Sequence, residues 1–214
     1  MRLPPARATL AIVAITGLAW LAAQAAGQSD RMALIAGFMP ARISQGLVLP
    51  GAVPVWLTPL SATLVHAGLI HVAFNLMMIA FCGRLVEASV GPGGMVLLYV
   101  VGAYAAAAAE YLFMPTSFAT MVGASGAGSA IIGAYALLYG KRRIKGWGPI
   151  PGRLLQVLWL AAGWIAIQAM LGFASAGMPG VPDGGVIATP AHVGGFLAGL
   201  ALARPLLLFR YRSA

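Results

Sequence analysis

The chain has 214 residues, of which 61% are hydrophobic and only 8% are charged. A soluble domain carries about 25% charged residues, so this composition excludes an ordinary soluble fold and indicates an integral membrane protein. The apolar runs are too long, and too mixed in period, for the weakly alternating strands of an outer-membrane barrel. We therefore predict an all-α, polytopic membrane protein whose surroundings are the lipid bilayer.

Six apolar segments approach the roughly 20 residues needed to cross ~30 Å of hydrocarbon. They cover about 8–26, 61–85, 95–113, 123–140, 154–174 and 191–209. We find no internal repeat and no appended soluble part, and we predict a single six-helix domain over residues 1–214. The first segment also fits a signal peptide, because Arg2 and Arg7 precede its apolar core and a small-residue stretch, Ala22 to Ala26, follows.

The stretch between the first two segments, from Gly27 to Leu60, is expected to be a long structured loop that lies against the bilayer interface. Its four prolines break it too often for a spanning helix, and it is too apolar for a solvated loop. Trp56 suits the membrane interface, where indole rings are favoured. The single cysteine, Cys82, excludes an internal disulfide and is expected to pack in a helix.

The basic residues fix the expected orientation. With six spans and a cytoplasmic N-terminus, only Arg31 and Arg42 fall outside. The other eleven fall at cytoplasmic ends: Arg2, Arg7, Arg84, Lys141, Arg142, Arg143, Lys145, Arg153, Arg204, Arg210 and Arg212. This positive-inside bias accounts for the net charge of +9, and we expect no nucleic-acid partner. Both termini are predicted to be cytoplasmic, in what we expect to be a bacterial inner membrane. The cluster from Lys141 to Lys145 is interpreted as a topology anchor, with anionic-lipid contact secondary.

This orientation brings the polar residues of three segments to one depth, near the outer face. They are His66 and His71, then Ser125, then His192, and they include all three histidines of the chain. Ser125 alone, flanked by glycines, is better explained by helix packing, because small residues let membrane helices approach. Ionisable groups inside a membrane are costly, however, and are functional candidates. The common depth of Ser125 and the three histidines favours a nucleophilic serine with a histidine base.

Helical spacing refines this interpretation. His71 and Asn75 are four residues apart and should share a helix face. His66, five residues before His71, should point elsewhere, toward the first loop. Glycines on the last helix and on the fourth would let the two approach closely enough for a hydrogen bond of ~2.6–3.2 Å between Ser125 and His192.

Three motifs in this order resemble those of the rhomboid intramembrane serine proteases. They are His66-Ala-Gly-Leu-Ile-His71-Val-Ala-Phe-Asn75, Gly123-Ala-Ser125-Gly126 and Ala191-His192-Val-Gly-Gly195-Phe-Leu-Ala-Gly199. Glu87-Ala-Ser-Val-Gly91 is similar to the E-x-x-x-G of the same family, where the glutamate is structural. The resemblance covers nearly the whole chain after the first loop.

The resemblance implies a role for each matched residue. Ser125 would be the nucleophile and His192 the general base, and the oxyanion hole would consist of His71, Asn75 and the Ser125 N–H. The supporting residues would be His66, Gly123, Gly126, Glu87, Gly195 and Gly199. No metal and no cofactor is expected. Asp183, in the loop before His192, stays open as a third member of the site, although a Ser–His dyad is our interpretation.

Two positions depart from the family pattern. Trp56 is followed by Leu57, where the family often has arginine, so the first loop is expected to be braced differently. Ser129 stands four residues after Ser125, where the family commonly has an aromatic that packs on the catalytic histidine. The second departure puts the level of activity in doubt, though not the mechanism.

These residues predict an intramembrane serine endopeptidase that cleaves transmembrane-helix substrates near the extracytoplasmic side. The fifth segment and the Gly- and Pro-rich loop Ala176–Pro190 are expected to form a moving gate. A rhomboid-like protein that binds membrane helices without cutting is the alternative, and a small transporter is a weaker one. The sequence leaves the natural substrate and the oligomeric state undetermined.

Overall fold

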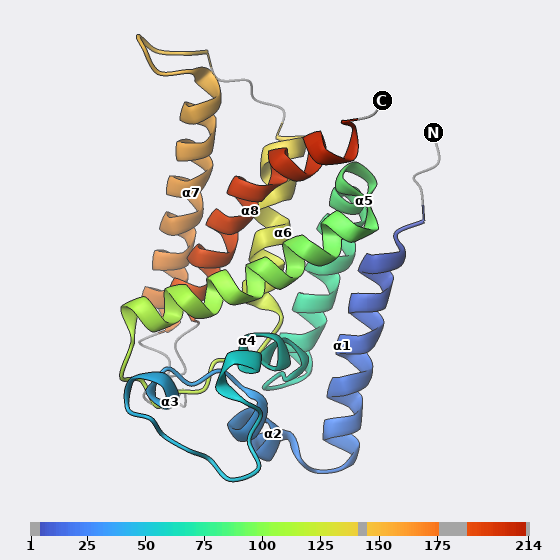
Figure 1. Cartoon of the computed structure of the whole chain (residues 1–214), viewed down its shortest axis with the longest axis vertical. Helices are drawn as coiled ribbons and strands as arrows, with labels where there is room; N and C mark the ends of the chain where they lie inside the picture. Colours follow the sequence, from blue (N-terminus) through green and yellow to red (C-terminus); the bar gives the residue numbers. More distant parts are fainter. Residues whose placement is uncertain (1–4, 141–144, 176–187, 213–214) are drawn as a thin grey trace.

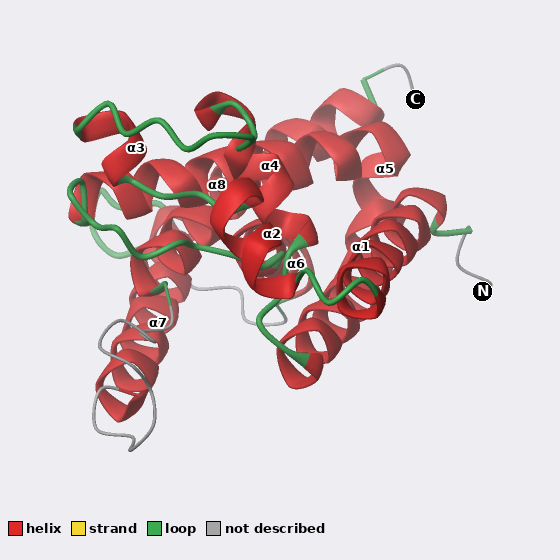
Figure 2. Ribbon diagram, turned by 90° about the horizontal axis from the view of Figure 1, so that it is seen from below, coloured by secondary structure: helices red, strands yellow, loops and turns green. Residues whose placement is uncertain are grey.

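A computed structural model describes residues 5–140, 145–175 and 188–212. Within these ranges the chain is helical, with isolated β-bridges and no strand, which confirms the all-α class (Figure 2). The longer helices are α1 (Arg7–Ala25), α2 (Ser29–Ala36), α5 (Leu69–Phe113), α6 (Ser125–Tyr139), α7 (Gly152–Ser175) and α8 (Thr189–Arg210). The short ones are α3 (Ala41–Ser44), η1 (Val55–Leu57), α4 (Thr58–Ser61) and η2 (Ala62–Leu64).

The predicted second and third segments are the two halves of the 45-residue helix α5, which folds back on itself at Gly91. A straight helix of this length would extend ~67 Å, about twice the hydrocarbon thickness. Gly91 has a φ of 79°, in the left-handed region that glycine adopts readily. Pro92 then opens the second half, where a missing N–H costs little. Each half is long enough to cross a membrane.

The predicted segments match the helices in place, with one correction. The segment 61–85 was predicted to begin too early, because Ser61 to Gly68 forms the end of α4, then η2 and a non-helical turn. Apolar composition does not distinguish this buried turn from a helix. Three helices, α1, α5 and α8, are long and apolar enough to span a membrane, whereas α6 and the apolar part of α7 are shorter. The count of six spans therefore stays a prediction.

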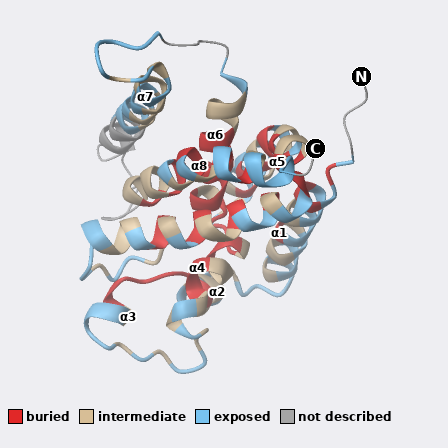
Figure 3. Ribbon diagram, turned by 45° about the horizontal axis from the view of Figure 1, so that its top comes forward, coloured by how far each residue is buried: buried red, intermediate tan, exposed pale blue. Residues whose placement is uncertain are grey.

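Helices α5, α6 and α8 form the core, α1 packs on α5, and α7 lies at the edge, mainly against α8 (Figures 1 and 3). Small residues let α6 and α8 approach to backbone contact. A Cβ at Gly195 or Gly199 would meet the backbone of α6, at Gly126 and Ala130 respectively, and one at Gly133 would meet the backbone of α8. Glycine is therefore required at these crossings.

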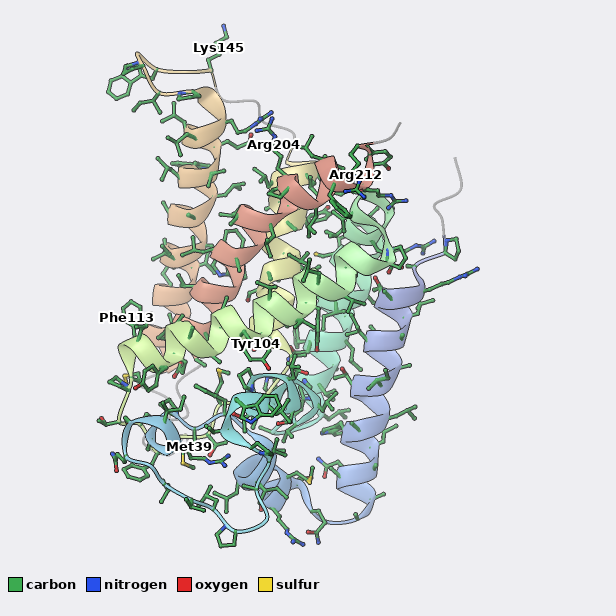
Figure 4. All side chains as sticks on the ribbon, in the orientation of Figure 1. Met39, Tyr104, Phe113, Lys145, Arg204 and Arg212 are labelled. Carbon is green, nitrogen blue, oxygen red and sulfur yellow. The ribbon has the colours of Figure 1, made fainter. Side chains whose placement is uncertain are left out.

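The first loop is structured, as predicted, and contains α2, α3, η1 and α4. It lies at the end of the molecule opposite Lys145, Arg204 and Arg212 (Figure 4). With Leu57 in place of arginine, hydrogen bonds to its backbone brace it instead: the Tyr104 hydroxyl donates to the Trp56 carbonyl at 3.0 Å. The Trp56 side chain itself is 66% exposed, as an interfacial indole would be.

Glu87 joins three helix ends near the bend of α5. Its buried carboxylate accepts hydrogen bonds from the backbone N–H groups of Ala8 (3.0 Å) and Thr9 (2.7 Å) and from the Thr9 hydroxyl (2.6 Å), at the start of α1. Arg210, at the end of α8, donates to the carbonyls of Glu87 and Ala88, both at 3.0 Å. These groups lie at helix ends, where backbone partners are otherwise lacking.

We expect Glu87→Ala to lower the free energy of unfolding by about 2–4 kcal/mol, because two buried N–H groups at the start of α1 lose their acceptor. Thermal unfolding in detergent micelles measures the change. Asp30→Asn, which alters an exposed acid in the first turn of α2, is the control and should shift the midpoint little. A Glu87→Ala protein as stable as this control would contradict a structural role for Glu87.

Candidate active site

Ser125 and His192 lie at the beginnings of two helices that the glycine contacts hold together. Ser125 is the first residue of α6, and His192 is in the first turn of α8. The Ser125 Oγ is 2.7 Å from the His192 Nε2. If the hydroxyl donates, Nε2 is unprotonated and the ring proton is on Nδ1. A serine hydroxyl within hydrogen-bond reach of a histidine base is the arrangement that activates a nucleophile.

The turn before Ser125 is held by backbone and histidine contacts. Gly123 donates its N–H to the Ala62 carbonyl at 2.9 Å. The Ala124 N–H donates to the His66 Nε2 at 3.3 Å, which requires that nitrogen to be unprotonated. His66 is 2% exposed, and it precedes α5. We predicted where His66 points from its spacing to His71 on a common helix. Residue 66 is not helical, so the premise of that prediction was wrong.

His71, on α5, lies directly against the turn that presents Ser125. A Cβ built on Gly123 would be 2.7 Å from the His71 Nε2 and 3.7 Å from the Ser125 Oγ. The imidazole edge and the hydroxyl thus border the same small space. The rings of His66 and His71 are 5.0 Å apart, in an edge-on arrangement.

Asn75 is on the same α5 face as His71, one turn further on. Its buried amide donates to the His71 carbonyl at 2.8 Å, which fixes the direction of the side chain. The amide has two N–H groups, so this bond uses one of its donors.

The start of α6 adds backbone donors and a favourable field. The first N–H groups of a helix lack partners within it, and they are the positive end of the helix dipole. Ser125 supplies such an N–H next to its own hydroxyl. A negative charge that develops beside Ser125 would be stabilised there.

A small cavity of ≈ 10 Å³ borders Ser125, enough for about one water molecule. Its lining comes from α4, η2, α5, α6 and the start of α8. The lining residues are Pro59, Thr63, Ala103, Ala106, Met121, Gly123, Ser125, Gly126, Ala127, Ala188 and Ala191. This space is too small to hold a peptide.

The other predicted residues are not all brought to this site. Gly126 packs against Ala106 of α5, and Gly195 faces the Gly126 carbonyl, so both belong to the helix contacts around the pair. Glu87 lies at the bend of α5 and contacts α1 instead. Asp183 is outside the described residues.

Sequence reasoning missed Trp164 of α7. Its indole N–H donates to the His192 carbonyl at 3.2 Å. Its ring stacks on Phe196, with centroids 4.8 Å apart and planes 8° from parallel. Nothing in the sequence separates Trp164 from Trp159 on the same helix, which is 67% exposed. Only the three-dimensional contact identifies it.

The fold and site define a helical integral membrane protein with a Ser–His pair at two closely packed helix starts. The Rhomboid domain family matches residues 54–209, and the chain belongs to the rhomboid family. It is 32% identical over 145 residues to the rhomboid protease GlpG of Pectobacterium atrosepticum, covering 67% of this chain and 46% of the relative.

Two further relatives show the same likeness. The rhomboid-like protein 11, chloroplastic, of Arabidopsis thaliana is 31% identical over 181 residues, covering 83% of this chain and 61% of the relative. The rhomboid protease GlpG of Klebsiella pneumoniae is 31% identical over 150 residues, covering 67% and 46%. The chain thus spans about half the length of the curated GlpG relatives it matches.

We expect Gly123→Ala to abolish the reactivity of Ser125 toward a fluorophosphonate. The φ of 113° at Gly123 is unfavourable for alanine, and the added methyl would displace the His71 ring. Gly128→Ala is the matched control, because its Cβ would meet only the Ile79 side chain at 3.7 Å and its φ is not positive. Labelling kinetics at equal thermal stability measure the effect. Normal labelling of Gly123→Ala would contradict this geometry.

Proposed function

We propose that this protein is an intramembrane serine protease that cleaves transmembrane-helix substrates near the extracytoplasmic side with a Ser125–His192 dyad. The observation that carries the proposal is the 2.7 Å separation of the Ser125 Oγ and the His192 Nε2. The relatives named rhomboid protease GlpG support the same reaction class. A rhomboid-like protein that only binds helices needs no base beside Ser125, and no observation favours that alternative.

The reaction follows from the two side chains. His192 Nε2 takes the hydroxyl proton as Ser125 Oγ bonds to the carbonyl carbon of the scissile peptide. The tetrahedral intermediate collapses, the C–N bond breaks, and the His192 proton goes to the leaving amine. Water, deprotonated by the same nitrogen, then attacks the acyl carbon; the bond from that carbon to Ser125 Oγ breaks, and the proton on His192 returns to Oγ as the second product leaves. No metal or cofactor takes part in these steps.

We assign the oxyanion to three donors. They are the His71 Nε2, which borders the space beside Gly123 together with the Ser125 Oγ, the second amide N–H of Asn75, and the backbone N–H of Ser125. Fixed donors in a site with little water stabilise a developing charge without reorganisation. His66 braces the turn through Ala124 and does not act on substrate.

Access for the substrate requires a movement, which we assign to α7. This helix packs mainly on α8 and less on α6, and most of its described residues are exposed or intermediate (Figure 3). Among the described residues, α7 is therefore a long helix with little packing against the rest of the protein, as a gate must be. The remainder of the proposed gate, residues 176–187, lies outside the described residues. A helical substrate must also unwind locally, which favours Gly or Pro near the cut.

The orientation is part of the proposal. Lys145, Arg204 and Arg212 lie at one end of the molecule and the first loop at the other (Figure 4). With the basic end in the cytoplasm, the cavity at Ser125, which α4 and η2 line, lies toward the outer face. Both termini are then cytoplasmic, in a bacterial inner membrane. Residues 1–214 form one domain in this proposal, and oligomeric state is not assigned.

We expect Ser125→Ala and His192→Ala each to abolish cleavage of a single-span test substrate almost completely. The double variant should lose little more, because the two residues act as one unit. Steady-state rates in detergent with matched thermal midpoints measure this. Substantial cleavage by Ser125→Ala would end the serine-protease assignment, and additive losses would separate the two residues.

We expect Asn75→Ala to lower kcat by about 10²- to 10³-fold, or about tenfold if His71 and the Ser125 N–H compensate, with near-normal stability. His66→Ala is the contrast, because it leaves the buried Ala124 N–H without an acceptor and should lose stability first. Measuring kcat, KM and the thermal midpoint separates the two roles. An Asn75→Ala protein that unfolds readily but keeps kcat would show that Asn75 only braces α5.

A further inference from the structure

The catalytic histidine has no aromatic neighbour from α6 at the position where the family commonly supplies one. That position is Ser129, which is buried and lies beside Gly195. Two rings lie close to the backbone of His192, one from α8 itself and one from α7. Phe196 is one turn after His192 on α8, and Trp164 of α7 stacks on it at 4.8 Å.

Trp164 also contacts the backbone of His192 itself. Its Nε1–H donates to the His192 carbonyl at 3.2 Å, across the interface between α7 and α8. His192 is in the first turn of α8, and first turns fray more readily than helix interiors. A bond from a neighbouring helix therefore restrains the backbone that carries the imidazole.

We propose that Trp164 is a positioning residue for His192, which replaces the missing aromatic of α6 with a restraint from α7. The stack with Phe196 fixes the indole plane, and the indole N–H fixes the carbonyl of the catalytic residue. The inference rests on the proposed function. It also means that displacing α7 would loosen His192, so the placement of the base depends on the position of this helix.

The Trp164→Phe variant removes the hydrogen bond. Phenylalanine keeps a ring that can stack on Phe196, but it lacks the N–H and is smaller than the bicyclic indole. The His192 carbonyl still has its helical partner four residues on, so no buried acceptor is left unsatisfied. The matched control is Trp159→Phe, the same change on the same helix at a side chain that is 67% exposed.

The experiment measures kcat, KM, fluorophosphonate inactivation and thermal midpoint for wild type and both variants. For Trp164→Phe we expect kcat and the inactivation rate each to fall about 3- to 10-fold with KM unchanged, as the loss of one modest hydrogen bond implies. Trp159→Phe should match wild type. The inactivation rate needs no peptide substrate, so a fall there shows that the base itself is less well placed.

Three results for Trp164→Phe would overturn the inference while leaving the proposed function intact. They are wild-type kinetics, a raised KM with unchanged kcat, and a lower thermal midpoint with unchanged kcat, which would show a purely structural role. Should Trp164→Phe fold poorly, Phe196→Leu tests the same point, because it removes the ring that orients the indole; unchanged kcat in that variant would overturn the inference. Wild-type protein that neither cleaves nor reacts would refute the proposed function, and this inference with it.

Discussion

The close contact between α6 and α8 is the constraint on which the site depends. In lipid there is little hydrophobic gain from joining two helices, so their association relies on packing and on hydrogen bonds. Gly195 and Gly199 let the α8 backbone meet α6 at Gly126 and Ala130, which any side chain at either glycine would prevent. Because Ser125 begins α6 and His192 is in the first turn of α8, the same contact sets the 2.7 Å distance between them.

The remaining elements hold this pair from two directions. The long helix α5 folds back at Gly91 and packs against both α6 and α8, and Glu87 and Arg210 join helix ends near the bend. At the other end, His66 and the Ala62 carbonyl fix the turn that leads into Ser125. The site therefore sits between two sets of buried hydrogen bonds, which restrain its geometry in a medium without water.

Much of this arrangement could be predicted from the sequence, because periodicity and spacing determine it. Apart from the start of α5, the apolar segments predicted the long helices to within a few residues, and the four-residue spacing put His71 and Asn75 on one face of α5. The start of α5 could not be predicted, since the buried turn before Leu69 is as apolar as a helix. The spacing argument for His66 failed for the same reason.

Contacts between distant segments were beyond sequence reasoning. The bond from Trp164 to His192 depends on how α7 lies against α8, and no pattern in α7 marks that tryptophan. The bracing of the first loop by Tyr104, in place of an arginine after Trp56, is likewise a tertiary contact between residues far apart in the chain. Such hydrogen bonds follow from packing, which local composition does not encode.

The central claim is that Ser125 is a nucleophile activated by His192. The most direct measurement is peptide mass spectrometry of the protein after reaction with a fluorophosphonate in lipid vesicles. We predict a single phosphonyl adduct on Ser125 of the wild type and none in His192→Ala, while both proteins remain folded. An adduct on another residue, or equal modification of Ser125 without His192, would contradict it.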